Sequence, residues 1–277
     1  MKRIKLKYLV SGLIAVFLAA FYLLPYWTAL VTATKPPLEI RTTNPLLPGS
    51  EMVFSYARTA WGMVNGSFIT SLRIAFTSMA VAIIVGSIGG YYLSKVRGRY
   101  VFGLLAILSI GIYIPSTVRL VPLVRVAKNL NLFGSPEYIG LAIGGGQLPV
   151  VTFIFREFYR KVPDPLVEAA EISGASHWQI YRYVMLPLSR TAAVTAGIIG
   201  FTVGWNNLIL PLILTSGSSG RPIMAQVDLM SRASAWEIGV WNLQLSGALF
   251  AMLPIVIIYI ILQEQIVQGW TEGAISG

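Results

Sequence analysis

Long apolar runs separated by short polar segments dominate this chain of 277 residues. A helix needs about 20 predominantly apolar residues to cross the hydrocarbon core of a bilayer. The lengths and spacing of the runs predict an all-α integral membrane protein with six transmembrane helices. The predicted spans are residues 8–31, 67–93, 100–123, 139–155, 191–215 and 241–262.

The first apolar run follows a basic leader, residues 1–7. A secretory signal peptide is the rival interpretation, but its apolar region usually has about 7–15 residues. The run 8–31 is longer, so we predict a first transmembrane span. We expect the rest of the chain to form an external loop at 32–66, a transmembrane core at 67–266 and a cytoplasmic tail at 267–277.

Basic residues in short loops indicate how the chain is oriented in the membrane. Lys95, Arg97 and Arg99 fall within five residues between the second and third predicted spans. Loops this rich in Lys and Arg remain in the cytoplasm. With six spans, both termini and the segment between spans four and five then lie on the cytoplasmic side.

Composition narrows the choice of function classes. The chain is 55% hydrophobic and 12% charged, with a formal net charge of +10. In a soluble chain that charge would suggest nucleic-acid binding, but here the basic residues set topology, so no nucleic-acid partner is expected. The absence of Cys and the single His177 leave no basis for a metal site or thiol chemistry.

The polar segment between spans four and five carries signals for a helix–turn–helix at residues 164–187. Asp164 can cap the first helix, with Pro165 at the first helical position. Gly174 lies where a left-handed C-terminal cap is needed. Ser176 opens the second helix, and Gln179 completes a capping-box pattern three residues later.

No catalytic or energy-coupling site is evident elsewhere in the sequence. Glu168 and Glu171 share one helical face with His177 downstream, which leaves a hydrolase as a weak alternative because no nucleophile–base pair accompanies them. No Lys follows a Gly, so a phosphate-binding loop is missing. No acidic residue lies in the middle of a predicted span, which disfavours coupling to protons or sodium.

The second helix of this segment carries an apolar stripe formed by Trp178, Tyr181, Val184 and Met185. Such a stripe either packs under the membrane domain or fills a groove on a partner protein. The sequence leaves both interpretations open, and different residues can serve each of them.

The segment resembles a known motif. Glu168-Ala169-Ala170, then Gly174, and then Val184-Met185-Leu186-Pro187 match the spacing of the EAA motif, Glu-Ala-Ala-x3-Gly-x9-Ile-x-Leu-Pro. That motif is typical of the membrane subunits of bacterial and archaeal ABC importers. Val184 replaces Ile conservatively.

The resemblance covers most of the chain. Asn65-Gly66-Ser67, Pro115, Pro122, Trp205-Asn206 and the ending from Gln268 to Gly277 are similar to carbohydrate-type permeases, the group of the smaller maltose-importer membrane subunit. The sequence departs from that group at Ser173, Asn207 and Ser276. These departures leave the fold intact but limit any transfer of substrate identity.

The resemblance implies a type I ABC importer permease fold with a cytoplasmic coupling helix between spans four and five. It implies four kinds of partner: a second homologous permease subunit, two ATP-binding cassette ATPase subunits, an extracytoplasmic solute-binding protein and the lipid bilayer. ATP and Mg would be bound by the ATPase, leaving this chain without a cofactor and without enzymatic activity. The expected location is the bacterial or archaeal inner membrane. The residues implied in ATPase coupling are Glu168, Ala169, Ala170, Gly174, Trp178, Tyr181, Leu186 and Pro187.

Contacts to a sugar or sugar-like solute are expected from aromatic and amide side chains in a partly apolar cavity. The candidates are Trp205, Asn206, Asn207, Tyr113, Ser116 and Gln147. An Asn in a span can instead bond a neighbouring helix. The alternative function is a six-span channel or secondary transporter without an ATPase partner, which co-purification would distinguish.

Overall fold

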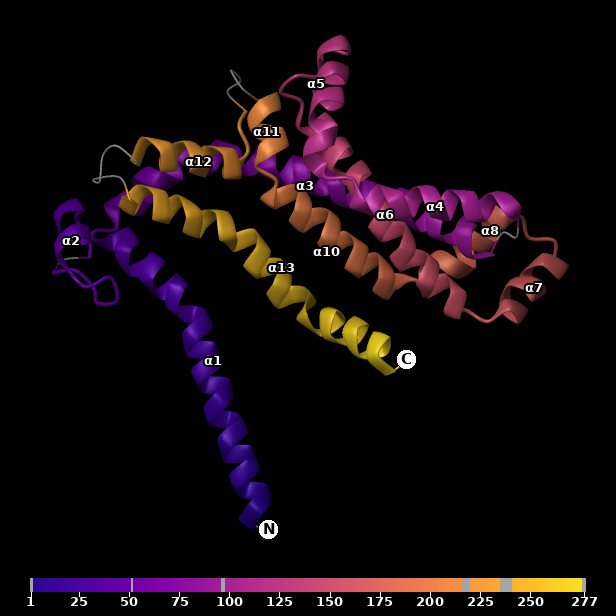
Figure 1. Ribbon diagram of the computed structural model, residues 1–277, viewed down its shortest axis with the longest axis horizontal. Helices are drawn as coiled ribbons and strands as arrows, with labels where there is room; N and C mark the ends of the chain where they lie inside the picture. The colour runs from indigo at the N-terminus through magenta and orange to yellow at the C-terminus, as the bar shows by residue number, and fades with distance from the viewer. Residues whose placement is uncertain (1, 51, 96–97, 216–219, 235–240, 276–277) are drawn as a thin grey trace. The chain divides into compact units, whose positions relative to one another are not determined.

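The computed structural model describes residues 2–50, 52–95, 98–215, 220–234 and 241–275, all of whose regular elements are helical (Figure 1). Side chains of residues 2–7, 99, 233–234 and 266–275 lie outside the description, as do Arg97 of the basic loop and Ser276 and Gly277 of the tail. The chain divides into two compact units, one of residues 1–65 with 226–253 and the other of residues 66–225 with 254–277.

The first unit is organised around the end of α1 (Lys2–Thr34) and the short helix α2 (Pro37–Thr42). Lys35 is almost fully buried there, and its Nζ donates to Thr43 Oγ1 at 2.9 Å and to the carbonyl of Asn44 at 2.7 Å. Asn242, on α13 (Trp241–Ile275), donates to the carbonyl of Lys35 at 3.1 Å. A buried amine is tolerated when its donors are satisfied in this way.

Glu39 on α2 closes the loop that follows the helix. The amide of Ser50 donates to Glu39 Oε2 at 2.9 Å, and the Ser50 hydroxyl donates to the other carboxylate oxygen. These hydrogen bonds hold the pKa of Glu39 below its ordinary value, because they stabilise the ionised carboxylate. The polar segment 32–66 therefore contains ordered helix and turn, with α3 (Ser55–Lys95) beginning inside it.

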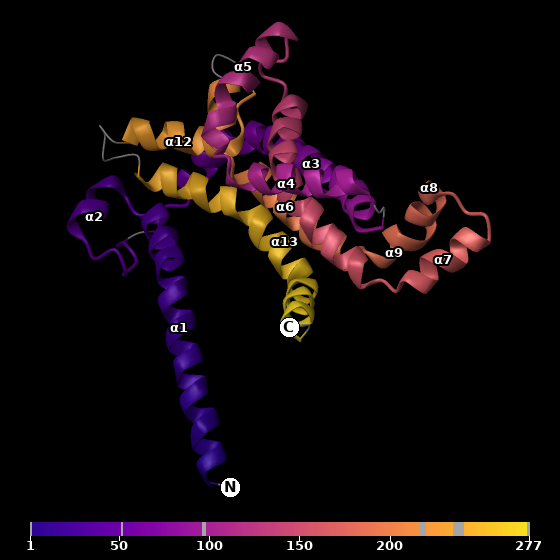
Figure 2. The same cartoon turned by 45° about the vertical axis from the view of Figure 1, so that its right-hand side comes forward.

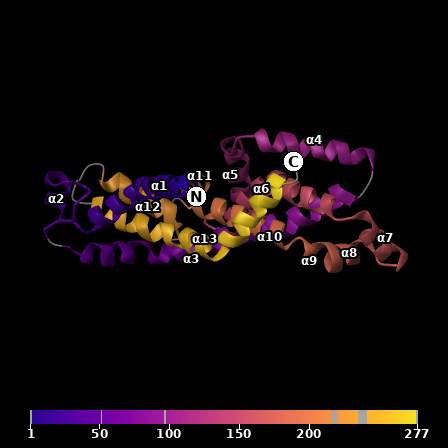
Figure 3. The same ribbon diagram turned by 90° about the horizontal axis from the view of Figure 1, so that it is seen from below.

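The second unit packs six elements around the later part of α3. In chain order they are α4 (Arg99–Tyr113), η1 (Ser116–Arg119), α5 (Leu120–Asn129), α6 (Pro136–Lys161), α10 (Arg190–Asn206) and α11 (Ile209–Leu214). Helices α6 and α10 lie side by side (Figure 3). The short helices α7, α8 and α9 connect these two.

Small residues allow α3, α6 and α10 to pack closely. A Cβ added at Gly144 of α6 would lie 2.8 Å from the carbonyl of Ser78 on α3. One added at Gly200 of α10 would lie 2.8 Å from Cα of Met79 on the same helix. Packing through small residues is a common means of joining membrane helices, since apolar burial alone does not distinguish protein from lipid.

Among the described residues, four helices are long and apolar enough to span a membrane, and two bent pairs bring the total to six if each pair is one span. The bend is 100° between Tyr100–Tyr113 and Ser116–Asn129, and 81° between His177–Leu188 and Arg190–Asn206. The predicted span 100–123 is therefore not one straight helix. Its α4 portion ends at Tyr113 because Ile114 adopts an extended conformation before Pro115.

Three further parts of the chain differ from the sequence prediction. The predicted span 191–215 is interrupted after Asn206, where Asn207 leaves the helical region and α11 begins at Ile209. The predicted loop 216–240 contains α12 (Ile223–Ser234), while residues 216–219 and 235–240 lie outside the described residues. Helix α13 continues to Ile275, well beyond the predicted end of the last span at 262.

Candidate functional site

The predicted helix–turn–helix is present and begins with α7 (Asp164–Ile172) (Figure 2). The predicted cap is wrong by one residue, because Asp164 is already helical and Pro163 takes the cap position without a side-chain hydrogen bond. The Asp164 carboxylate accepts a hydrogen bond at 2.7 Å from Nζ of Lys95, at the end of α3. Lys95 also donates to the carbonyl of Val162 at 2.9 Å, so it fixes where α7 starts.

The turn after α7 has the geometry that the sequence predicts. Gly174 has φ +82, the left-handed region in which a side chain is strained. The amide of Ala175 donates to the carbonyl of Ala170 at 3.0 Å, and that of Gly174 donates to Glu171 at 2.9 Å. This pair of bonds is the Schellman arrangement, and it satisfies the last carbonyls of the helix.

The second helix starts with the predicted capping box. The Ser176 hydroxyl accepts from the amide of Gln179 at 3.3 Å, and Gln179 Oε1 accepts from the amide of Ser176 at 2.7 Å. After one turn of α8 (His177–Ile180) the backbone widens into a π-helix, η2 (Tyr181–Met185), followed by α9 (Leu186–Leu188). The wider turn comes directly before Pro187, whose ring would clash with the carbonyl four residues back in a regular α-helix.

One face of the helix–turn–helix is buried against the membrane domain. Its contributors are Val167, Ile180, Tyr181 and Met185, which pack with Tyr91, Phe155 and Tyr159 in one core cluster. Ser87 Oγ and the Tyr181 hydroxyl lie 2.7 Å apart, and both are buried. The hydroxyl of Tyr159 donates to Ser189 Oγ at 3.1 Å. These bonds tie the second helix to α3 and to α6.

The opposite face is exposed and mixes apolar with acidic side chains. Ile172 is 88% exposed, which makes it the most exposed large hydrophobic side chain among the described residues. Trp178 and Tyr183 are 56% and 71% exposed, and Glu168 is also exposed. A segment predicted to lie outside the bilayer gains nothing from exposing apolar groups unless a partner covers them.

The structure therefore separates the predicted coupling residues into two groups. Glu168, Ala169, Gly174, Trp178 and Pro187 are exposed, whereas Tyr181 is buried and Ala170 and Leu186 are partly buried. The apolar stripe expected on the second helix divides in the same way, since Met185 is fully buried and Val184 partly buried.

Sequence reasoning missed two exposed residues on this face, Ile172 and Tyr183. Ile172 is the last residue of α7, next to the predicted cap at Gly174. One signal for the exposure of Ile172 was available in the sequence. Ile172 lies five residues after Val167, which faces inward, and residues five apart on a helix point in different directions.

A second feature is a polar pocket of about 440 Å³ in the same compact unit. Four of the six residues predicted to line a substrate path meet there: Ser116, Gln147, Asn206 and Asn207. The pocket lies where two helices are broken, between α4 and η1 and between α10 and α11. Irregular backbone is tolerated at membrane depth when it lines a cavity, so the two breaks and the pocket belong together.

The other two predicted path residues do not line this pocket. Tyr113 is 83% exposed at the end of α4. Trp205 is 1% exposed and stacks on Phe201 with ring centroids 6.0 Å apart. Arg119 does line the pocket, which the sequence did not predict.

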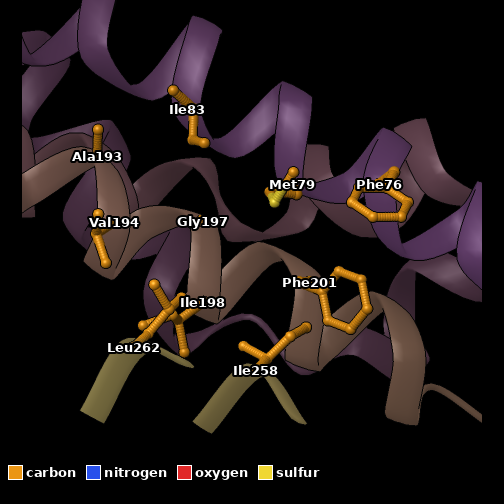
Figure 4. A pocket seen from close by; sticks show the side chains of 10 residues that line it. All are labelled: Phe76, Met79, Ile83, Ala193, Val194, Gly197, Ile198, Phe201, Ile258 and Leu262. Atoms are coloured by element: carbon orange, nitrogen blue, oxygen red, sulfur yellow. The ribbon is translucent and has the colours of Figure 1, made fainter. Parts of the chain in front are cut away.

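An apolar groove of about 380 Å³ lies between α3, α10 and the later part of α13 (Figure 4). Phe76, Met79 and Ile83 project from α3 toward Phe201 and Ile198 of α10. Its lining consists of apolar side chains and one glycine, so it offers no hydrogen-bonding group to a polar solute. Within the described part of the chain, no three His, Asp or Glu side chains gather in a way that could hold a metal ion.

Comparisons with known proteins agree on one kind of molecule. Residues 78–272 match the family model described as binding-protein-dependent transport system inner membrane component. The chain is 36% identical to a probable ABC transporter permease of Pyrococcus horikoshii, over 100% of both chains. It is 28% identical to the xylose/arabinose import permease of Haloferax volcanii, covering 92% of this chain and 89% of that one.

Two more comparisons extend the likeness. The chain is 28% identical to the sn-glycerol-3-phosphate transport system permease of Salmonella typhi, with 92% of each chain covered. A crystal structure of a bacterial ABC transporter involved in the import of the acidic polysaccharide alginate superposes with a TM-score of 0.78 at 17% identity, covering 94% of this chain and 96% of that one. This likeness confirms the predicted fold class.

Proposed function

Because the chain belongs to the family of inner membrane components of binding-protein-dependent transport systems, we propose that it docks a separate ATPase subunit on the helix–turn–helix at residues 164–188. It would form half of the translocation path of an ATP-driven importer. ATP and Mg would be bound by the ATPase, and this chain would couple hydrolysis to movement of its helices.

The observation that carries this proposal is the division of the helix–turn–helix into a fixed face and a free face. The fixed face holds Tyr181 and Met185 in the core. The free face presents Ile172 and Trp178 beside the acidic Glu168. An amphipathic helix with exposed apolar anchors is suited to a groove on a partner, and the acid adds a charge for orientation.

The path from this surface to the polar pocket supports a role in transport. Helix α6 carries Gln147 at the pocket and leads directly toward α7, while α10 starts just after Ser189 and ends with Asn206 at the pocket. The 15 residues from Gln147 to Lys161 span about 20 Å of helix. Two packed helices of this length can transmit a displacement of the docking surface to the pocket as rigid rods.

We propose that the solute is a sugar or a sugar-like molecule. The pocket combines the amide side chains of Gln147, Asn206 and Asn207 with the hydroxyl of Ser116, a set suited to hydrogen bonds with solute hydroxyls. Two relatives, the xylose/arabinose import permease and the sn-glycerol-3-phosphate permease, are named for solutes that are compatible with this class.

The assembly we propose has three kinds of protein component besides this chain. A second homologous permease would complete the path, two ATPase subunits would engage the two coupling segments, and an extracytoplasmic binding protein would deliver the solute. The complex would lie in a bacterial or archaeal inner membrane with both termini of this chain in the cytoplasm.

The test is a substitution at Gly174, which has φ +82 and no other atom within 4 Å of an added Cβ. In the reconstituted importer, we expect Gly174→Trp to reduce transport-coupled ATP hydrolysis at least tenfold, because it strains the turn by about 1–2 kcal/mol and adds bulk only where a partner would lie. Glu168→Lys should also reduce it, by reversing the charge on the free face.

Gly62→Trp is the matched control, because its Cβ would also meet open space and its backbone is not in the left-handed region. The control should hydrolyse ATP normally. Normal coupled hydrolysis in both Gly174→Trp and Glu168→Lys, or purification of an active transporter without an ATPase, would contradict the proposal.

A further inference from the structure

Arg119 lies in the polar pocket in an unusual setting. It is the last residue of η1, and it follows the break that Pro115 imposes on the helix pair. Its guanidinium packs against Gly146 of α6, where an added Cβ would overlap it. Its Nε is buried and has no hydrogen-bond partner among the described residues.

Three other arginines show how this chain pairs a guanidinium with a carboxylate. Arg73 donates to Glu137 at 2.8 Å, Arg232 donates to Asp228 at 2.7 Å, and Arg156 pairs with Glu157. Within the described part of the chain, no such ion pair is found for Arg119. None of the residues lining the pocket is acidic.

An arginine within a transmembrane segment is costly unless it has a partner, so it is a candidate for a functional site. The other polar residues that line the pocket are neutral hydrogen-bonding groups, and the remaining lining residues are apolar; the polar ones are Ser116, Thr117, Gln147, Asn206 and Asn207. The pocket thus contains one fixed positive charge surrounded by groups that suit hydroxyls and carbonyls.

We propose that Arg119 binds a carboxylate or phosphate group of the transported solute, while the amide side chains bind its hydroxyl groups. The solute class is then a polyhydroxylated acid, such as a uronic acid or a polyol phosphate. Guanidinium matches both anions because its planar donors form two parallel hydrogen bonds with them. This inference depends on the proposed function, since the pocket must lie on the translocation path.

Because Gly146 has no side chain, the pocket has room for the guanidinium of Arg119. Any larger residue there would occupy the place of the guanidinium and push Arg119 away from Gln147, one residue further along α6. Arg119 is partly buried, and its guanidinium lies against Gly146 in the pocket that Gln147, Asn206 and Asn207 also line.

The experiment measures protection of Arg119 from phenylglyoxal, which modifies arginine, by peptide mass spectrometry. The assembled importer is placed in vesicles of phosphatidylcholine alone and in vesicles that also contain anionic phospholipid, both without nucleotide and trapped with a non-hydrolysable ATP analogue. The probes are two matched pairs, galacturonate with galactose and glycerol 3-phosphate with glycerol. Exposed Arg125 on α5 serves as the internal reference.

We expect at least one acidic probe to slow modification of Arg119 at least fivefold in one of the two states. Its neutral counterpart should have no effect, and Arg125 should react equally with every probe. In Gly146→Leu, where the guanidinium is displaced, protection by the acidic probe should be lost while Arg125 stays unchanged.

Three outcomes would overturn the inference. Equal reactivity with acidic and neutral probes would remove the charge preference. An Arg119 that stays unreactive in every condition would indicate a carboxylate from another subunit. Protection without solute, found only in vesicles that contain anionic phospholipid, would assign the site to a lipid headgroup. The Gly174→Trp variant tests the proposed function separately. If that variant loses coupled hydrolysis and any of these three results is also found, the proposed function is supported and only this inference is wrong.

Discussion

The helix–turn–helix at residues 164–188 is the proposed coupling segment. Tyr181 determines which way its second helix faces. Its ring is 5% exposed and lies between Tyr91 and Trp178, with centroids 5.5 Å and 5.3 Å away. Its hydroxyl lies 2.7 Å from Ser87 Oγ on α3. Because Tyr181 points inward, Tyr183 on the other side of the π-helix points outward and is 71% exposed.

The Tyr181→Phe variant tests this anchoring role. It removes the hydroxyl and leaves Ser87 without its partner on the coupling segment, a loss of about 1–2 kcal/mol. We expect a lower thermal unfolding midpoint of the purified importer and a smaller ratio of transported solute to hydrolysed ATP.

The control is Tyr183→Phe, which removes the same atom from an exposed ring. It should leave both the unfolding midpoint and the transport ratio unchanged. Equal effects from the two variants would show that the bond between Tyr181 and Ser87 does not anchor the segment.

Local chemistry explains which residues could be predicted from the sequence. Gly174, Ser176 and Gln179 act on their own backbone within three residues, so their roles follow from short-range rules. The inward orientation of Tyr181 and the placement of Arg119 beside Gly146 depend on helices far away in the sequence. No local pattern could have supplied either.

Among the elements, Lys95 connects the end of α3 to the start of α7. Its side chain is only 7% exposed, and its Nζ bonds both the Asp164 carboxylate and the carbonyl of Val162. Asp164 itself is 59% exposed, so solvent weakens the electrostatic part of the contact. The contact still fixes the position of α7, because the Lys95 amine donates two hydrogen bonds at the start of that helix.

We expect Lys95→Met to loosen α7 and to leave the Val162 carbonyl without this donor, at a cost of about 1–3 kcal/mol. The reconstituted importer should then hydrolyse ATP with less transport per ATP. The measurement is the ratio of uptake to phosphate release in vesicles.

Arg232→Met is the control, because it breaks the exposed pair with Asp228 on one helix, worth about 0.3–0.5 kcal/mol. The exchange Lys95→Asp with Asp164→Lys should restore part of the coupling. An unchanged ratio in Lys95→Met would mean that this contact plays no part in coupling.

Element boundaries were harder to predict than the elements themselves. The apolar runs correctly indicated helices, but they did not show that the helix breaks at Asn207, four residues before Pro211, whose ring would clash with the Asn207 carbonyl in an uninterrupted helix. The π-helix at Tyr181–Met185 also depends on tertiary packing. It accommodates Pro187 while Tyr181 and Met185 stay buried. Sequence patterns report average periodicity and cannot resolve such single-turn adjustments.

For the whole molecule, the coupling segment and the polar pocket lie in the same compact unit of residues 66–225 with 254–277. Helices α6 and α10 join them: α6 passes the pocket at Gln147 and ends just before α7, and α10 starts just after Ser189 and ends at the pocket with Asn206. We therefore propose that energy from a partner ATPase enters this chain at the exposed face around Ile172 and Trp178.

The most direct test uses the absence of cysteine in the sequence. A single cysteine is introduced as Ile172→Cys, at a side chain that is 88% exposed, or as Leu38→Cys, at one that is 75% exposed on α2. Each is labelled with a maleimide benzophenone and irradiated in membranes that contain the assembled importer. Mass spectrometry then identifies the cross-linked partner.

The account predicts that Ile172→Cys forms a cross-linked product with the ATPase subunit and that Leu38→Cys does not. A product with the ATPase from Leu38→Cys alone, or no such product from either position, would contradict it.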